Sequence, residues 1–242
     1  AYDIPLRLVG AEMCIRDRWQ WEELPDGIRF SLYSPDGEGG FPGNIRVITD
    51  YRFNEDNELS VRHYAETDCA TYINMTNHAY FNLCGKGKKI TEHRLHIPAD
   101  RILDTTPAFI PTGKRMNVKN TPFDFTSLKP IGTDLYADHE QLLWNKGYNH
   151  CYILKDEISV EMLEAASLYE PVTGRNMTVM TDLPAVLLYT AGYYERPDTA
   201  VCLETQFYPD TPSHSDFPSC LVLPEKAYEH CTLFHFQVQK EE

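Results

Sequence analysis

The chain has 242 residues, of which 42% are hydrophobic and 24% charged, and its formal net charge is −14. This length suffices for one buried core, and the acidic balance argues against nucleic acid or an anionic membrane as a partner. Seven cysteines, none in Cys-x-x-Cys spacing, favour reduced thiols and a cytoplasmic location, and no apolar run approaches the roughly 18 residues of a membrane span.

Residues 1–18 show no periodicity and no turn pattern. Within them, residues 13–18 read as the translation of a transposase sequencing adapter. We therefore interpret residues 1–18 as non-native sequence from adapter read-through, with an irregular N-terminal arm as the alternative.

From residue 19 onward, short runs alternate apolar and polar residues, which is typical of half-buried strands. The expected strands are residues 27–33, 45–53, 58–65, 71–76, 93–98, 150–154, 159–163 followed by 164–169, 176–181, 185–190, 201–206 and 232–238. Turn-forming residues stand at 34–43, 54–57, 106–107 and 111–113, and the best helical segment, 134–146, is short and weakly amphipathic. Short strands, frequent turns and almost no helix predict an all-β sandwich or barrel in one domain, residues 19–242.

The segment 74–83 places His78 between two asparagines and two aromatic residues. An imidazole has an unperturbed pKa of about 6.5, which suits proton transfer near neutral pH. The neighbouring amides, with the Tyr80 hydroxyl, are hydrogen-bonding groups that suit a polyol. A histidine at a strand end is more often structural when it stands alone, so a catalytic role for His78 requires a partner.

Glu204 is the candidate partner, because it lies in an otherwise apolar strand that enters a proline-rich loop. If strand alternation holds, Cys202 and Glu204 share one face, and the carboxylate points into a concave interior. Desolvation there raises the pKa of a carboxyl group and makes it a better base near neutral pH. The alternative is an outward-facing glutamate on a half-exposed strand.

Two other segments carry weaker signals. His214 is flanked by Asp210 and Asp216, but the spacing matches no compact ligand pattern, so we expect no metal site there. Residues 85–89 lack the strand–loop–helix context of a phosphate-binding loop, and a solvated turn is the better interpretation.

Taken together, these motifs resemble those of the aldose 1-epimerase (galactose mutarotase) family. Segment 74–83 is similar to the family's Asn-x-Thr-Asn-His-x-Tyr-Phe-Asn-Leu motif. Further segments agree in order and spacing: 34–37 with 41–43, 111–113, 121–125, 147–150, and 203–206 followed by 209–210. The resemblance runs from about Trp19 to the C-terminus. It implies a large antiparallel β-sandwich of the galactose mutarotase type that interconverts the α and β anomers of free aldohexoses such as glucose or galactose, without metal or cofactor.

The resemblance also implies roles for individual residues. His78 would be the general acid that protonates the ring oxygen, and Glu204 the base that takes the anomeric hydroxyl proton. Asn77, Tyr80 and Asn149 are expected to bind sugar hydroxyls.

The sequence departs from the family pattern at three places. Asn149 stands where the family usually has Asp, and Leu187 stands where many members have Gln, so charge-assisted or polar contacts with the sugar are lost. The N-terminal part of the family's domain, which supplies an Asn-Arg pair and a further His, has no counterpart. We therefore expect a sandwich incomplete at its N-terminal side and a chain with weak or no activity.

Two other functions stay open. A sugar-binding module without catalysis would lose only binding, not turnover, when His78 or Glu204 is replaced by alanine. A hexose 6-phosphate 1-epimerase would need Arg or Lys near the site to meet the phosphate, and the motif residues are flanked by no such cluster.

Overall fold

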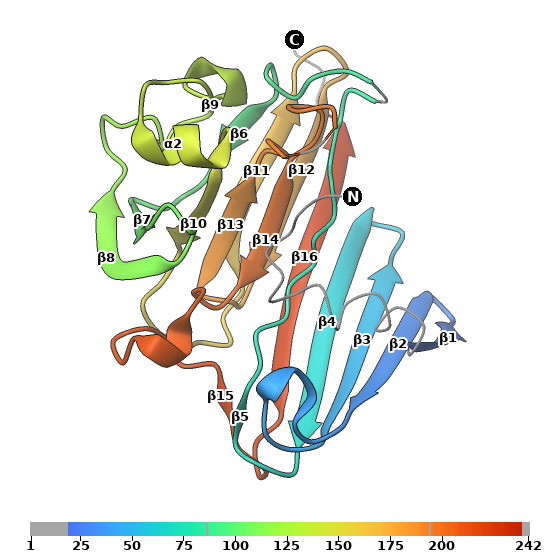
Figure 1. Cartoon of the computed structure of the whole chain (residues 1–242). Coiled ribbons are helices and arrows are strands. Elements are labelled where there is room, and N and C mark those ends of the chain that lie inside the picture. Colours follow the sequence, from blue (N-terminus) through green and yellow to red (C-terminus); the bar gives the residue numbers. More distant parts are fainter. Residues whose placement is uncertain (1–18, 86, 194, 239–242) are drawn as a thin grey trace.

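The computed structural model, shown in Figure 1, describes residues 19–85, 87–193 and 195–238. The interpretation of residues 1–18 as a non-native or irregular arm lies outside the described residues. Strands dominate the described chain and form three sheets. The helices of this part of the chain are all too short or too polar to cross a membrane.

The largest sheet has nine strands in the order β1-β2-β3-β4-β16-β12-β11-β6-β9, and the second has five in the order β14-β13-β10-β7-β8. The first comprises β1 (Gln20–Leu24), β2 (Gly27–Ser34), β3 (Ile45–Phe53), β4 (Glu58–Thr67), β16 (Tyr228–Val238), β12 (Arg175–Thr181), β11 (Leu163–Glu170), β6 (Arg94–His96) and β9 (Lys129–Pro130). The second comprises β14 (Cys202–Gln206), β13 (Ala185–Tyr189), β10 (Asn149–Ile153), β7 (Arg101–Thr105) and β8 (Pro111–Asn117). A small third sheet pairs β15 (Leu221–Val222) with β5 (Thr71–Tyr72). The described helices are α2 (Glu140–Asn145) and the 3₁₀ turns η2 (Glu38–Gly40), η3 (Ile131–Thr133) and η4 (Thr211–Ser213).

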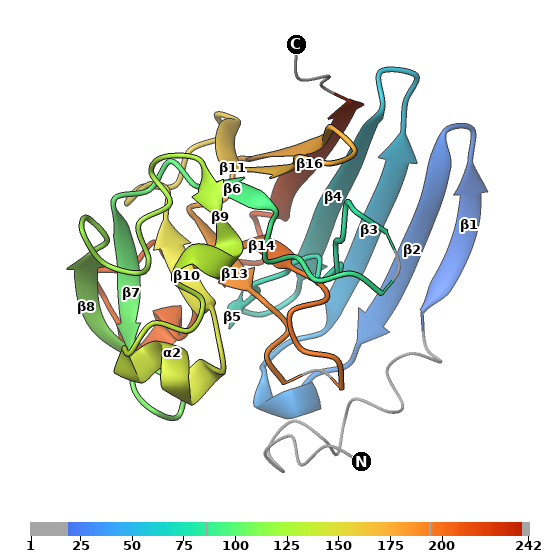
Figure 2. The ribbon, with the colours of Figure 1, turned by 90° about the horizontal axis from the view of Figure 1, so that it is seen from above.

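All paired strands of the described chain are antiparallel. The two larger sheets pack on each other around a shared core, and Figure 2 shows β1 to β3 extending beyond the smaller sheet. The large sheet contributes Val61, Leu95, Leu168, Met177 and Phe234, and the smaller one Ile102, Tyr152, Val186, Leu188 and Leu203. Burying one such side chain contributes about 1.5–3 kcal/mol. The predicted all-β antiparallel sandwich is confirmed, and its interpretation as one domain, residues 19–242, stays a prediction.

Within the described residues, the other face of the five-stranded sheet is covered only in part. Side chains alternate between faces along each strand, and residues paired across strands lie on the same face. A small cluster covers one part of this face: Leu103, Cys151, Ile153, Ala185, Tyr208 and Phe217. Asn149, Leu187 and Tyr189 share the face but are only half-buried. This half-open area lies where β13 ends and β14 begins, and it holds the candidate site.

The predicted strand 71–76 was too long. Only Thr71–Tyr72 forms a strand, β5, because the residues after it bond to loops instead of a neighbouring strand. Asn74 in particular exchanges hydrogen bonds with the backbone of Phe207 through its side-chain amide, at 2.9 and 3.1 Å.

The predicted strand 159–163 was also wrong, since β11 begins only at Leu163. The alternating apolar residues of this segment pair with no neighbouring strand in the described chain, and Val160 is 93% exposed. The Lys155 ammonium donates to the carbonyls of Ser159 and Glu161 and holds this segment as a loop.

Other elements were missed or overextended. Strands β7 and β8 were not predicted. Pro111 and Gly113 indicate a turn, but both residues lie in β8, an edge strand, where a residue without an N–H is tolerated. Strands β1, β9 and β15 were missed as well. The predicted helix 134–146 is reduced to α2. This helix begins after His139, whose ring accepts a hydrogen bond from the Gln141 N–H. It ends before Lys146, which adopts the left-handed conformation.

Candidate active site

His78 lies in an extended segment between β5 and β6 that runs beside β14 (Figure 1). The segment is fixed on both sides of the histidine. Before it, the Asn74 amide bonds to the backbone of Phe207. After it, Phe81 and Val201 exchange both backbone hydrogen bonds, at 2.8 and 3.0 Å. These anchors hold the imidazole against the start of β14.

Glu204 lies in the middle of β14, where the neighbouring strand β13 places Leu187 directly opposite it. The glutamate is only 6% exposed. Burial penalises the charged form of the carboxyl group and raises the pKa of Glu204 to about 7. The alternative of an outward-facing, solvated glutamate is therefore wrong, and the predicted rise in pKa is confirmed.

The two predicted catalytic side chains meet. His78 Nε2 lies 3.4 Å from Glu204 Oε1, and the His78 side chain is 50% exposed whereas that of Glu204 is 8% exposed. One proton-transfer group is thus desolvated and the other is accessible from solvent. Such an arrangement favours a base of raised pKa beside an acid that a ligand can reach.

Aromatic rings surround the imidazole. Tyr80 stacks on His78 with ring centroids 5.1 Å apart, and Tyr189 lies edge-on to His78 at 6.1 Å and to Tyr80 at 6.4 Å. Burial raises the pKa of Tyr189, so its hydroxyl stays protonated. Its oxygen accepts the Tyr193 N–H at 3.4 Å, which leaves the Tyr189 proton able to donate to a ligand. Sequence reasoning missed Tyr189, because its run, 185–190, reads as a buried central strand.

The predicted sugar-binding residues lie near the His78–Glu204 pair, and each is related to it in a different way. Asn149 lies opposite Tyr189, which in turn lies opposite Cys202, so Asn149 stands on the same sheet face as Glu204. Asn77 precedes His78 and is half-buried. The sugar-binding roles of Asn77, Tyr80 and Asn149 stay predictions.

The site also contains a set of possible metal ligands. His78, Cys202 and Glu204 each offer one ligand atom, and these atoms all lie within 4.8 Å of one another. Imidazole, thiolate and carboxylate are the ligands that zinc prefers. Burial, however, raises the pKa of the Cys202 thiol, which disfavours the thiolate that a metal requires. Near His214, where no metal site is expected, Asp216 is paired with Arg115 at 2.6 Å.

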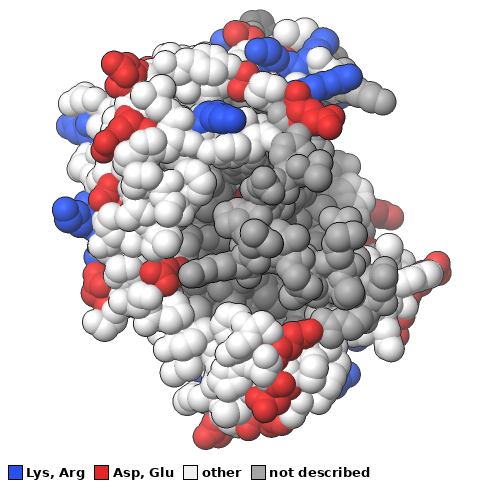
Figure 3. All heavy atoms as spheres, in the orientation of Figure 1, with Lys and Arg blue, Asp and Glu red and all other residues white. Residues whose placement is uncertain are grey.

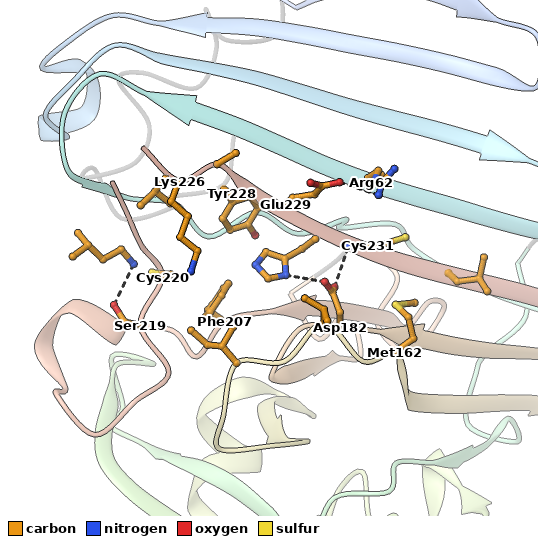
Figure 4. A pocket seen from close by; sticks show the side chains of 17 residues that line it. Arg62, Met162, Asp182, Phe207, Ser219, Cys220, Lys226, Tyr228, Glu229 and Cys231 are labelled. Atoms are coloured by element: carbon orange, nitrogen blue, oxygen red, sulfur yellow. Dashed lines mark hydrogen bonds and ion pairs between the residues drawn. The ribbon is translucent and has the colours of Figure 1, made fainter. Parts of the chain in front are cut away.

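A different hollow, of about 640 Å³, opens between the loop after η4 and strands β4 and β16 (Figure 4). Two pairs of charged groups in its lining bond to each other. Asp182 accepts from the Cys231 N–H and bonds to the His230 ring, at 2.9 and 3.0 Å, and Arg62 pairs with Glu229 at 2.8 Å. These groups are therefore engaged with each other rather than available to a reacting ligand. The His78–Glu204 pair is the better candidate for the active site.

The protein is all-β, and the His78–Glu204 pair, a candidate for acid–base chemistry, lies on the half-open face of its smaller sheet. The family model described as "Aldose 1-epimerase" matches residues 11–235. Galactose mutarotase from Rattus norvegicus is 34% identical over 232 residues, covering 91% of this chain and 66% of that protein. Aldose 1-epimerase from Escherichia coli K12 is 32% identical over 240 residues, covering 94% and 69%. The chain belongs to the aldose 1-epimerase family, which confirms the resemblance inferred from the motifs.

Solved structures agree on the fold. An aldose epimerase homologue from C. elegans superposes with a TM-score of 0.80 at 24% identity, covering 92% of this chain and 69% of that one. Galactose 1-epimerase from Lactobacillus acidophilus NCFM gives a TM-score of 0.79 at 25% identity, covering 92% and 67%. The chain spans about two thirds of the length of the curated relatives that it matches.

Proposed function

We propose that this chain interconverts the α and β anomers of a free aldose by acid–base opening and closing of the sugar ring. The observation that carries this proposal is the contact between His78 Nε2 and the buried Glu204 carboxylate, at 3.4 Å. The ring oxygen and the anomeric hydroxyl oxygen of an aldose are bonded to the same carbon. Two adjacent proton-transfer groups can therefore serve both oxygens at once.

In the proposed reaction, the Glu204 carboxylate removes the proton of the anomeric hydroxyl while protonated His78 donates a proton to the ring oxygen. The bond between C1 and the ring oxygen breaks, and C1 becomes an aldehyde. Rotation about C1–C2 presents the other face of the aldehyde. Reclosure reverses both transfers, so no proton is gained or lost. A pKa of about 7 makes Glu204 a stronger base than an ordinary carboxylate while a substantial fraction stays ionised near neutral pH.

Asn77, Tyr80 and Asn149 are proposed to bind the remaining sugar hydroxyls, and Tyr189 joins them as a neutral donor. The relatives are named galactose mutarotase and aldose 1-epimerase, which supports galactose or glucose as substrate and favours neither a binding module nor a sugar phosphate epimerase. Asp and Glu side chains are interspersed with Lys and Arg around the face in Figure 3, and the formal net charge of −14 suits an uncharged sugar better than an anionic one. The six described cysteines are free thiols, which supports a cytoplasmic location.

Polarimetry of freshly dissolved α-D-glucose and α-D-galactose tests the proposal. We expect weak activity, in which the chain accelerates the approach to anomeric equilibrium only modestly above the spontaneous rate. We expect the rate to be lower than in family members with Asp and Gln at the positions of Asn149 and Leu187. Binding of either sugar with no acceleration at high protein concentration would instead identify a binding module.

Leu187 offers a test of how the pocket sets the basicity of Glu204. Its side chain lies directly opposite Glu204 on the same face, and its apolar surface contributes to the desolvation of the carboxylate. In Leu187→Gln, an amide that donates to the carboxylate should lower the pKa of Glu204. The acid limb of the kcat/KM–pH profile should then move down by roughly half to one pH unit.

The matched control is Leu187→Met, which keeps the position apolar and similar in volume. It should leave the acid limb where it is in the parent chain. An unchanged limb in Leu187→Gln would show that this neighbour does not control the carboxylate.

A further inference from the structure

The His78–Glu204 pair has a third neighbour that the proposed reaction does not use, the thiol of Cys202. One imidazole nitrogen, the Cys202 sulfur and one Glu204 carboxylate oxygen all lie within 4.8 Å of one another. Among the described residues, this is the one group of three histidine, cysteine or carboxylate side chains whose ligand atoms lie so close together. Nitrogen, sulfur and oxygen atoms of these side chains are the ligands that Zn²⁺ takes in proteins.

The separations between these atoms fit a zinc ion. Zinc bonds to such ligands at about 2.0–2.3 Å in tetrahedral geometry, so its ligand atoms stand roughly 3.3–3.7 Å apart. His78 Nε2 and Glu204 Oε1 already lie 3.4 Å apart. The Cys202 sulfur lies within 4.8 Å of both partners, so a shift of about 1 Å completes a set of three ligands.

The two segments that carry the three side chains are bonded to each other. Cys202 and Glu204 are two positions apart in β14, so their side chains lie on the same face of the sheet. Beside the site, Phe81 and Val201 exchange backbone hydrogen bonds between the two segments, at 2.8 and 3.0 Å. The ligand set is therefore largely preformed, and the 50% exposed side chain of His78 gives a cation access from solvent.

A divalent cation also balances the charge of this buried site. Burial raises the pKa of the Cys202 thiol and that of the Glu204 carboxyl group, because each anion is poorly solvated there. A bare thiolate is therefore unfavourable, but Zn²⁺ with one thiolate, one carboxylate and a neutral imidazole has no net charge. Binding forms bonds from zinc to nitrogen, oxygen and sulfur and releases the thiol proton to solvent, with no oxidation or reduction.

We propose that His78, Cys202 and Glu204 bind Zn²⁺, and that the bound ion holds the chain inactive. The zinc site itself depends only on these three side chains. The inactivation rests on the proposed function, because zinc at His78 and Glu204 occupies both proton-transfer groups and competes with an aldose for them. Zinc is thus an inhibitor of the proposed reaction, whose proton transfers need no metal.

Titration of the reduced 242-residue chain with Co²⁺, a spectroscopic substitute for Zn²⁺, tests the binding without depending on turnover. Bound Co²⁺ should produce the near-ultraviolet charge-transfer absorption of a cobalt–thiolate bond, and Zn²⁺ should remove this absorption by displacing Co²⁺. Mg²⁺ should not compete, because it prefers oxygen ligands.

Cys202→Ala should abolish the cobalt–thiolate absorption. It should weaken Zn²⁺ binding by at least roughly 100-fold, since even the loss of an outer-shell partner costs about 10–100-fold. Cys202→Ser, which is closer in size to the parent residue, should act in the same direction. Cys151→Ala is the matched control, because Cys151 is also a buried thiol of the five-stranded sheet but lies outside the ligand group. This control should keep both the absorption and the affinity.

The parent chain alone provides a second test. Saturating D-glucose should weaken Zn²⁺ binding, and Zn²⁺ should suppress the acceleration of α-D-glucose mutarotation, which a chelator should restore. No cobalt–thiolate absorption in the parent chain, or an absorption that survives both Cys202 substitutions, would overturn the zinc site while leaving the proposed function intact. Zinc binding that leaves the mutarotation rate unchanged would overturn the inactivation.

Failure of the proposed function gives a different result. A chain that binds Zn²⁺ through Cys202 but does not accelerate mutarotation even with a chelator present would overturn the proposed function and the inactivation together. The zinc site would then stand alone.

Discussion

Replacing Glu204 with glutamine should lower the protein-catalysed part of the α-glucose mutarotation rate, measured above the spontaneous background, by as much as about 10²–10⁴-fold, which is the usual contribution of a general base. Glutamine is nearly the same size and keeps a hydrogen-bonding group, but it cannot accept a proton from the anomeric hydroxyl. His78→Asn should reduce the rate by a similar factor, because it removes the proton donor 3.4 Å away. The two groups act in one proton exchange, so the double variant should be hardly slower than either single variant.

Polarimetry at equal concentrations of folded protein measures these rates. The matched control is Glu170→Gln, since Glu170 is also buried but lies in β11 of the large sheet, where its carboxylate accepts hydrogen bonds from Val172 and Thr173. This control should leave the rate essentially unchanged. A Glu204→Gln variant that keeps the parent rate would exclude Glu204 as the base.

The same substitution should stabilise the folded chain at alkaline pH. Glu204 has a pKa of about 7 in the folded state against 4.5 as its ordinary value. The folded state therefore holds a proton that the unfolded state has lost between these values, and the free energy of unfolding falls as pH rises through this window. Above pH 7 the full penalty of the buried charge is present, about 3 kcal/mol at most. Glutamine carries no charge, so Glu204→Gln should be more stable than the parent chain by about 1–3 kcal/mol at pH 8.

Urea unfolding at pH 4 and pH 8 measures this difference. At pH 4 the carboxyl group is largely protonated in both states, and the two chains should be nearly equal in stability. The exposed Glu157 provides a control, because Glu157→Gln should change stability little at either pH. A Glu204→Gln chain that is less stable than the parent at pH 8 would show that contacts of the ionised carboxylate outweigh its desolvation.

Local sequence pattern was sufficient where strands alternate regularly. The predicted strand 45–53 coincides with β3, because its alternation continues to both ends and turn-forming residues flank it. Sequence pattern gave wrong predictions where tertiary contacts determine the local structure. Pro111 and Gly113 have the chemistry of a turn but pair as an edge strand, whereas Val160 and Met162 have the alternation of a strand but lie in no strand of the described chain.

The candidate site was predictable in identity but not in geometry. Motifs pointed to His78 and Glu204, yet their contact depends on hydrogen bonds between segments far apart in the sequence. Asn74 and Phe207, which bond to each other, are separated by 133 positions. Tyr189 could not be recognised, because only the pairing of β13 with β14 shows that its ring shares a face with Glu204.

The central claim is that a buried carboxylate of raised pKa is the base, and the pH dependence of kcat/KM for α-D-glucose tests it most directly. The base must be ionised, so activity should fall on acidification with an apparent pKa of about 7, the value that burial gives Glu204. An acid limb near 4.5, with full activity retained at pH 5.5, would contradict the account, because the base would then be an ordinary solvated carboxylate.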